Sequence, residues 1–128
     1  MKTIPVTCAI ILFDNKTLAV QRSETMKLPL KWEFAGGKIE LGESETDCIK
    51  REIFEELNIH IEVKKRLTTV IHEYPDFKIE LIPFTAEYIS GTLKLSEHSN
   101  FILANKEELL NLDWAEADLP VLEEYLAL

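Results

Sequence analysis

One segment of the chain, GGKIELGESETDCIKREIFEELNI from Gly36 to Ile59, restricts the possible folds more than any other. Ile49, Ile53 and Leu57 recur at positions i, i+4 and i+8, which is the spacing of one face of an α-helix. Phe54 is expected to widen that face. The segment therefore predicts an amphipathic helix with a buried apolar side.

Residues at both ends of this helix indicate where it begins and ends. Ser44 is the predicted N-cap, with Asp47 three residues on in an arrangement close to a capping box. Asn58 can take the left-handed backbone conformation that ends a helix. Before the helix, the Gly36-Gly37 pair lets the backbone bend sharply or approach a ligand closely.

Three glutamates, Glu52, Glu55 and Glu56, are expected to share the side of the helix opposite its apolar face. Like charges at i, i+3 and i, i+4 repel one another, so a purely structural helix has reason to avoid this arrangement. Most acidic helix faces are simply solvated. The Gly-Gly turn, Glu43 at the loop–helix junction and the adjacent Arg51 favour instead a site that a cation completes.

The rest of the chain alternates predicted strands and helices. Thr3–Phe13 is typical of a strand buried on both faces, and DNK at Asp14–Lys16 predicts a hairpin turn into TLAVQR. Alternating apolar and polar residues predict two or three further strands in IHIEVKKRLTTVIHEY and FKIELIPFTAEYI. Helices are expected at 106–111 and in ADLPVLEEYLAL, with Asp118 at the N-cap. These elements predict a mixed α/β sandwich.

Composition limits the class of protein. The 128 residues are expected to form a single domain, 1–128, and the formal charge of -9 disfavours a protein that coats nucleic acid. Metal ions can still bridge an acidic protein to a phosphorylated small molecule. Cys8 and Cys48 lack the spacing of a zinc site or a disulfide framework, and the first strand does not resemble a signal peptide. No apolar stretch approaches the ~20 residues of a membrane span, so we expect a cytoplasmic protein.

The glycine turn and acidic helix resemble the Nudix box: Gly, five residues, Glu, seven residues, Arg-Glu, an apolar residue, any residue, Glu-Glu, any residue, Gly and an apolar residue. Eight residues fill their positions at the correct spacing: Gly37, Glu43, Arg51, Glu52, Ile53, Glu55, Glu56 and Ile59. Asn58 stands where the pattern has Gly. Because Asn is the next best residue for that backbone conformation, we expect a small loss of stability and no loss of chemistry.

Outside the box, the chain is similar to the MutT-type nucleoside triphosphate pyrophosphohydrolases. WEFAGGKIE resembles the segment that leads into the box in that branch, SEH at Ser96–His98 resembles its late Glu-bearing loop, and ADLPVLEEYL its terminal helix. The resemblance covers nearly the whole chain. It implies the Nudix α/β/α sandwich, with a mixed β-sheet between helices.

The resemblance also implies a metal site. Its carboxylates would be Glu52, Glu55 and Glu56, joined by the backbone carbonyl of Gly36 and by Glu97. Mg2+ is the expected ion, with Mn2+ as a possible substitute, because hard cations prefer carboxylate, carbonyl and water oxygens. Bound metal would cancel the repulsion within the helix and neutralise the oxygens of a triphosphate. Glu52 or Glu97 would then be the general base that takes a proton from the attacking water.

Four further residues have expected roles around the phosphates. Arg51 is expected to orient Glu52 through charge-assisted hydrogen bonds. Lys38 is a candidate for stabilising charge on the leaving phosphate and Arg22 for contacting a phosphate, with a solvated side chain as the less favoured alternative for each. Glu43 is expected to act at the helix start or as a secondary metal contact, and not as the essential base.

Three residues are candidates for the nucleobase pocket. Phe34 would either stack on a base or belong to the core, and Asp118 would either read the base edge or serve only as an N-cap. Phe77 stands where a MutT-type relative can have Arg, which argues against guanine-type recognition. Three histidines are too scattered for a metal trio and are expected to be non-ligands: His60, His72 and His98.

We therefore expect a Mg2+-dependent hydrolase that cleaves a nucleoside triphosphate, such as oxidised 8-oxo-dGTP, to the monophosphate and pyrophosphate and so cleanses the nucleotide pool. One alternative is a pyrimidine-preferring enzyme acting on CTP or modified dCTP, favoured by AGG in place of the more usual PGG and by the SEH loop. Others are a catalytically silent nucleotide-binding Nudix module and an acidic protein-interaction module. The expected partner is a small-molecule substrate, without nucleic acid or membrane. Monomer and homodimer both remain open.

Overall fold

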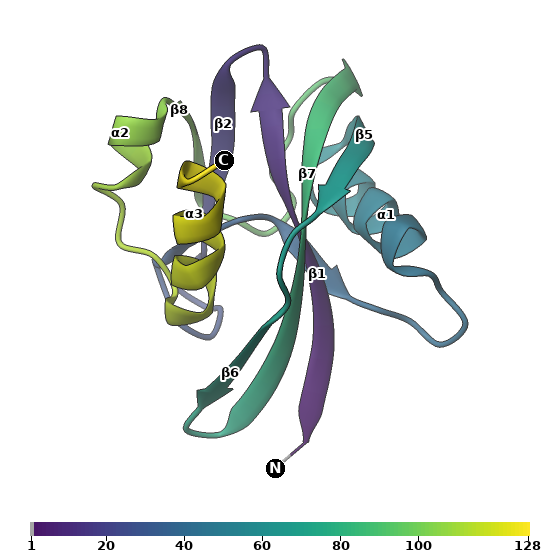
Figure 1. Cartoon of the computed structure of the whole chain (residues 1–128), viewed down its shortest axis with the longest axis vertical. Helices are drawn as coiled ribbons and strands as arrows, with labels where there is room; N and C mark the ends of the chain where they lie inside the picture. Colours follow the sequence, from purple (N-terminus) through teal and green to yellow (C-terminus); the bar gives the residue numbers. More distant parts are fainter. Residues whose placement is uncertain (1) are drawn as a thin grey trace.

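A mixed β-sheet runs through the centre of the molecule, with helices on both of its faces (Figure 1). The structure is a computed structural model that describes residues 2–128. Within this range the strands are β1 Thr3–Phe13, β2 Lys16–Gln21, β3 Trp32–Glu33, β4 Gly36–Lys38, β5 Ile59–Arg66, β6 Val70–Tyr74, β7 Phe77–Gly91 and β8 Asn100–Ala104. The helices are α1 Glu45–Leu57, α2 Lys106–Leu109 and α3 Leu119–Leu126, with a 3-10 turn, η1, at Glu116–Asp118.

The sheet is organised around one parallel pair, β1 and β7, in register from Thr3 opposite Lys78 to Leu12 opposite Glu87. All other strand pairs are antiparallel: β2 and β4 pair with β1, β3 and β8 with β2, and β5 and β6 with β7. The middle of β1 is buried by layers on both sides, which explains its continuous apolar run. The predicted mixed sheet is confirmed.

Two apolar cores lie on opposite faces of the sheet. Ile49, Ile53 and Leu57 of α1 are fully buried in one, as predicted. The other core lies beneath α2 and α3 and includes Leu109, Trp114, Val121 and Tyr125. The α/β/α sandwich is therefore confirmed.

Phe54 was wrongly expected to join the buried face of α1. Its side chain is 47% exposed and stacks on the ring of His60 at 4.9 Å between centroids. Residue 54 follows Ile53 by about 100° around the helix, so its side chain lies at the edge of the apolar face and not within it.

The ends of α1 agree with the sequence. The side chain of Ser44 accepts a hydrogen bond from the backbone N–H of Asp47 at 3.1 Å, and Asn58 adopts the left-handed conformation with φ of 60°. The Asn58 side-chain amide also donates to the carbonyl of Thr92 at 2.9 Å. A complete capping box is found at α2, between Asn105 and Glu108. Across residues 2–128, none of the helices combines the length and apolar character needed to cross a bilayer.

Candidate active site

The Gly36-Gly37 pair places the sheet and α1 in close contact. A Cβ at Gly36 would lie 1.8 Å from the carbonyl oxygen of Thr7, so β4 can approach β1 this closely only with glycine at that position. A Cβ at Gly37 would lie 2.2 Å from the carboxyl group of Glu52, which therefore packs directly over this residue. The Thr7 hydroxyl donates to the carbonyl of Gly37 at 3.3 Å. The glycine turn thus fixes one side of the acidic site.

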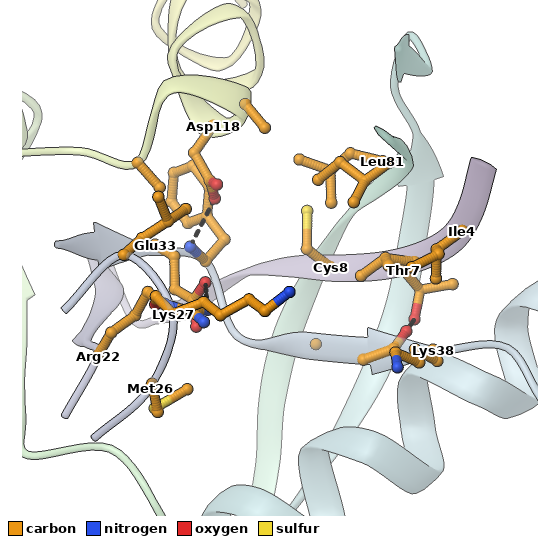
Figure 2. Close-up of a pocket in the computed structure, with 18 of the residues that line it drawn as sticks. Ile4, Thr7, Cys8, Arg22, Met26, Lys27, Glu33, Lys38, Leu81 and Asp118 are labelled. Carbon is orange, nitrogen blue, oxygen red and sulfur yellow. Dashed lines mark hydrogen bonds and ion pairs between the residues drawn. The ribbon is translucent and has the colours of Figure 1, made fainter. Parts of the chain in front are cut away.

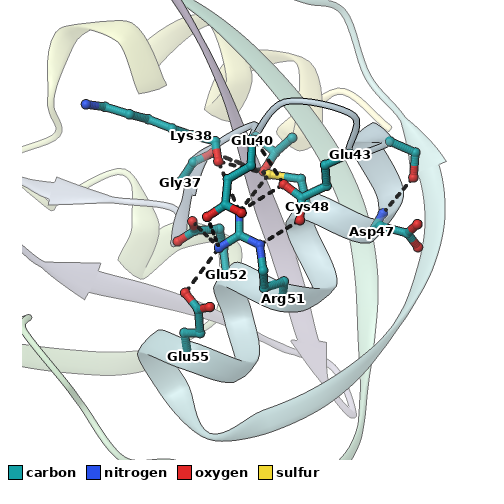
Figure 3. Close-up of polar contacts among 11 residues, drawn as sticks. Gly37, Lys38, Glu40, Glu43, Asp47, Cys48, Arg51, Glu52 and Glu55 are labelled. Atoms are coloured by element: carbon teal, nitrogen blue, oxygen red, sulfur yellow. Dashed lines mark hydrogen bonds and ion pairs between the residues drawn. The ribbon is translucent and has the colours of Figure 1, made fainter.

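Arg51 lies at the centre of a network of carboxylates (Figure 3). Its guanidinium donates to both oxygens of Glu43, at 2.6 and 2.9 Å, and to Glu52 at 2.8 Å. It also donates to Glu55 at 3.1 Å and to the carbonyl of Lys38 at 3.2 Å. The predicted contact that orients Glu52 is therefore present. Hydrogen bonds from Arg51 are the largest cause that lowers the pKa of Glu43 to about 2.

The three glutamates of α1 do not share one environment, contrary to the expectation of a common acidic face. The side chains of Glu52 and Glu56 are only 16% and 18% exposed, whereas Glu55 is 56% exposed and turned toward Arg51. The difference arises because Glu52 and Glu56 are one turn apart and lean toward the sheet, while Glu55 lies beside them on the solvent side.

Glu56 is the most perturbed carboxyl group near the helix. Burial is the largest cause that raises its pKa to about 9, followed by the charges of Glu52 and Glu33, and Glu97 contributes as well. Glu56 is thus a little-exposed carboxyl group close to three other acidic side chains, those of Glu33, Glu52 and Glu97. The site is therefore electrostatically suited to receive a cation.

Glu97 reaches this site through the loop that follows β7. The backbone N–H groups of Lys94 and Ser96 donate to the carbonyls of Leu57 and Glu56, each at 3.0 Å. Carbonyls in the last turn of a helix have no partner within the helix, so the loop satisfies them and is anchored there. This anchoring brings Glu97 beside Glu56, although the two residues are far apart in the sequence.

The donor set fits a hard divalent ion. Carboxylate oxygens and a backbone carbonyl are the ligands that Mg2+ and Mn2+ prefer, and the charges of Glu52, Glu33 and Glu97 act on Glu56 at this place. Within residues 2–128 no three His, Cys, Asp or Glu side chains are already arranged for metal binding. Arg51 instead holds Glu52 and Glu55 in ion pairs.

A pocket of about 330 Å³ opens beside this site (Figure 2). Gly36, Glu56 and Glu97 line it at the border with α1. Figure 2 shows Arg22, Glu33 and Asp118 near one end of the pocket and Ile4, Thr7 and Leu81 toward the other. A mostly apolar pocket with a few polar groups at one end is typical of a binding site for a small molecule.

Two of the predicted base-pocket residues are part of the pocket wall and also of the buried structure. Phe34 packs against Trp114 at 4.7 Å between ring centroids, so it belongs to the core while lining the pocket. The carboxylate of Asp118 accepts a hydrogen bond from the backbone N–H of Phe34 at 2.9 Å. Burial, and then the charge of Glu33, raises the pKa of Asp118 well above its usual range.

Asp118 stands at the N-cap position of α3, but the expected capping hydrogen bond is absent because its side chain is turned into the pocket wall. Phe77 also lines the pocket. It stacks on Tyr74 at 4.9 Å, and the amino group of Lys27 lies 4.5 Å above its ring.

The two predicted phosphate-binding cations differ in their surroundings. Arg22 lines the pocket, and its guanidinium donates to Glu33 at 2.8 Å and to the carbonyl of Lys27. Lys38 borders the pocket with an exposed side chain that extends away from the carboxylates around Arg51 (Figure 3). No carboxylate within the described range, 2–128, forms an ion pair with Lys38. Of these two residues, Arg22 is therefore engaged in an ion pair and Lys38 has none among the described residues.

Two polar residues of the pocket were missed by sequence reasoning. Glu33 lies between Arg22 and His98, with contacts of 2.8 Å to each. His98 is buried and lines the pocket, a position that the sequence did not indicate. The motifs WEF and SEH contained both residues, but neither motif indicates that they meet across 65 positions of the sequence.

A pocket lined by two carboxyl groups with raised pKa values, Glu56 and Asp118, is typical of an enzyme that acts on a small polar substrate. Comparison with known proteins specifies this class. The NUDIX domain model matches residues 3–125. The chain is 38% identical to a CTP pyrophosphohydrolase of Escherichia coli strain K12 over 128 residues, covering 100% of this chain and 95% of that protein.

A second relative, an 8-oxo-dGTP diphosphatase of the same strain, is 32% identical over 82 residues, which are 63% of this chain and 64% of the relative. Among solved structures, a Nudix hydrolase from methicillin-resistant Staphylococcus aureus 252, described as the DNA mismatch repair protein MutT, is 41% identical with a TM-score of 0.77. The match covers 96% of this chain and 95% of that one. The chain therefore belongs to the Nudix family. It is a hydrolase of phosphoric anhydride bonds that resembles the MutT-type members.

Proposed function

We propose that this protein is a Mg2+-dependent nucleoside triphosphate pyrophosphohydrolase that releases a nucleoside monophosphate and pyrophosphate. Nudix hydrolases generally use divalent metals, and the choice of Mg2+ is part of the proposal. The observation that carries it is the meeting of Glu52, Glu56 and Glu97 beside the pocket next to Gly36. A triphosphate in the pocket would have its phosphates close to these carboxylates.

The metal would be held by Glu52, Glu56, Glu97 and the carbonyl of Gly36, with Glu55 joining them when it leaves Arg51. When bound, the ion would neutralise the phosphate oxygens so that water can attack phosphorus. The low exposure of Glu52 and Glu56 and the raised pKa of Glu56 support that assignment.

The chain's own residues would position the substrate and move the proton. Glu52 or Glu97 would accept a proton from the attacking water, and the hydrogen bond from Arg51 would hold Glu52 in one orientation. Glu43 has both oxygens bonded to Arg51, so we propose an orienting role for it and no role as the base. Lys38, with no competing ion pair, would stabilise charge on the leaving phosphate.

The base of the substrate separates two candidates. An oxidised purine such as 8-oxo-dGTP is supported by the diphosphatase relative, and its hydrolysis would cleanse the nucleotide pool. A pyrimidine triphosphate such as CTP or modified dCTP is supported by the relative that matches the whole chain. Phe34, Phe77 and Asp118 line the pocket that would hold either base, and Arg22 is at its polar end.

The deciding experiment measures initial rates of pyrophosphate release across normal and oxidised triphosphates with Mg2+ supplied. We expect the wild-type protein to hydrolyse at least one of them and Glu56→Gln to lose orders of magnitude in kcat while remaining folded. Release of orthophosphate alone would show that a different phosphoric anhydride bond is cleaved and would refute the proposed reaction. Nucleotide binding without turnover would identify a silent Nudix module, and an absence of both would favour a protein-interaction module.

We further propose that residues 1–128 act as a single domain in the cytoplasm, on a small-molecule substrate and without nucleic acid or a membrane. The relatives named above act on nucleotides, which supports the small-molecule partner. Monomer and homodimer are both compatible with this proposal, and size-exclusion chromatography with light scattering would separate them.

A further inference from the structure

His98 connects the pocket to the carboxylate site. Its side chain is 2% exposed, and its ring lies between two acidic groups on different elements. Nε2 is 2.8 Å from an oxygen of Glu33, while Nδ1 is 3.6 Å from an oxygen of Glu56 and has no hydrogen-bond partner. A buried polar atom without a hydrogen-bond partner costs free energy, so the position of this ring requires an explanation.

The contact with Glu33 is the shorter and better formed of the two. A carboxylate can only accept, so Nε2–H of His98 donates to one oxygen of Glu33, while Arg22 donates to the other oxygen at 2.8 Å. Glu33 is thereby held at both oxygens, although its side chain is still 17% exposed and lines the pocket. The remaining lone pairs of a fixed carboxylate can accept hydrogen bonds from a ligand.

We propose that His98 is a positioning residue for substrate recognition, which fixes the Glu33 carboxylate at the polar end of the pocket. This inference rests on the proposed function, because it assigns part of the recognition of the same substrate. A fixed carboxylate accepts hydrogen bonds and offers none, so it selects a substrate edge with N–H groups, such as an amino-bearing nucleobase. His98 acts only through Glu33 and does not bind metal.

A purely structural role for His98 makes a different prediction. His98 follows Glu97 directly, so a disturbed loop would displace Glu97 and lower kcat. If His98 instead acts through Glu33, its loss raises KM and leaves kcat nearly unchanged. The effect of losing His98 on KM must also disappear once Glu33 is no longer a carboxylate, because substitutions of residues that act through one another do not have additive effects.

The test compares two amides at position 98. The side-chain nitrogen of His98→Gln can reach the position of Nε2 and donate to Glu33, whereas that of His98→Asn is too short and reaches only the position of Nδ1. We expect His98→Asn to raise KM about tenfold, the effect of losing one hydrogen bond to a charged group, and His98→Gln to restore most of it. In a Glu33→Gln background, His98→Asn is expected to change KM by less than about twofold.

The matched control is His60→Asn, which changes an exposed histidine that stacks on Phe54 away from the pocket. Equal KM values for the two amides at position 98, or an equal effect of His98→Asn with and without Glu33, would overturn the inference. So would a loss of kcat with unchanged KM. Wild-type turnover is measured first, because its absence refutes the proposed function itself. If the wild type turns over normally and the variants give any of the contradicting results above, only the role of His98 is refuted.

Discussion

Gly37→Ala tests the position of Glu52 without altering any carboxylate. The added Cβ would lie 2.2 Å from the carboxyl carbon and one carboxyl oxygen of Glu52, whereas ordinary contact begins at 3.4 Å. Glu52 must therefore retreat by about 1.2 Å, which separates it from the place where the substrate is to be attacked. Misplacing a catalytic group by about 1 Å can cost 10²-fold in rate, so we expect kcat to fall by about that factor.

Stability is expected to change little in the same variant. Gly37 has no positive φ, and its Cβ meets the flexible end of a side chain, so alanine is tolerated by the backbone. Loss of the 2.8 Å contact between Arg51 and Glu52 costs at most about 1 kcal/mol, and the reduced entropy of the unfolded chain offsets part of it. Thermal unfolding should therefore shift by only a few degrees.

Gly36→Ala provides the contrasting control, because its Cβ would lie 1.8 Å from the backbone oxygen of Thr7. No side chain can move to relieve that clash, so the β1–β4 pairing must break and the melting temperature must fall strongly. The assay pairs initial rates of pyrophosphate release with thermal unfolding for both variants. A folded Gly37→Ala protein with near-normal kcat would refute the catalytic importance of the position of Glu52.

Three other predictions concern pH and metal. The pKa of Glu43 is lowered from 4.5 to about 2, so its ionised form stabilises the fold above pH 4.5, and this contribution is lost as pH falls toward 2. Urea unfolding should therefore show that the stability of Arg51→Gln depends less on pH in this range than the stability of the wild type does. Asp118 has a pKa raised above 3.8, so the wild type loses stability as pH rises beyond 3.8, and Asp118→Asn should become the more stable protein toward neutral pH in the same assay. Chelation with EDTA should abolish turnover and leave the circular dichroism unchanged, while Mg2+ should raise the melting temperature of the wild type and not of Glu56→Gln.

Local features of the fold could be predicted from the sequence because nearby residues determine them. The cap at Ser44, the buried face of α1 and the left-handed Asn58 all follow from spacing within one short segment. Phe54 was placed wrongly because residue periodicity alone does not show where a helix face ends. Glu33 is in a two-residue strand, β3, which is too short to give a periodic signal.

The polar end of the pocket could not be predicted, because its contacts join distant segments. The hydrogen bond between Asp118 and Phe34 spans 84 positions, and that between His98 and Glu33 spans 65. The first joins η1 to the segment between β3 and β4, and the second joins β3 to the loop between β7 and β8. A residue's type and spacing identify it as a candidate, but only the register of the sheet determines its partner.

The repulsion among the glutamates of α1 is resolved within the chain itself. Arg51 neutralises Glu52 and Glu55 by ion pairs, and the raised pKa of Glu56 favours its protonated form. The helix therefore compensates part of this repulsion internally, in addition to the compensation that a bound metal would supply. A metal bound as proposed would compete with Arg51 for Glu52 and Glu55, so its binding would be coupled to a local rearrangement of side chains at the site and not to folding of the helix.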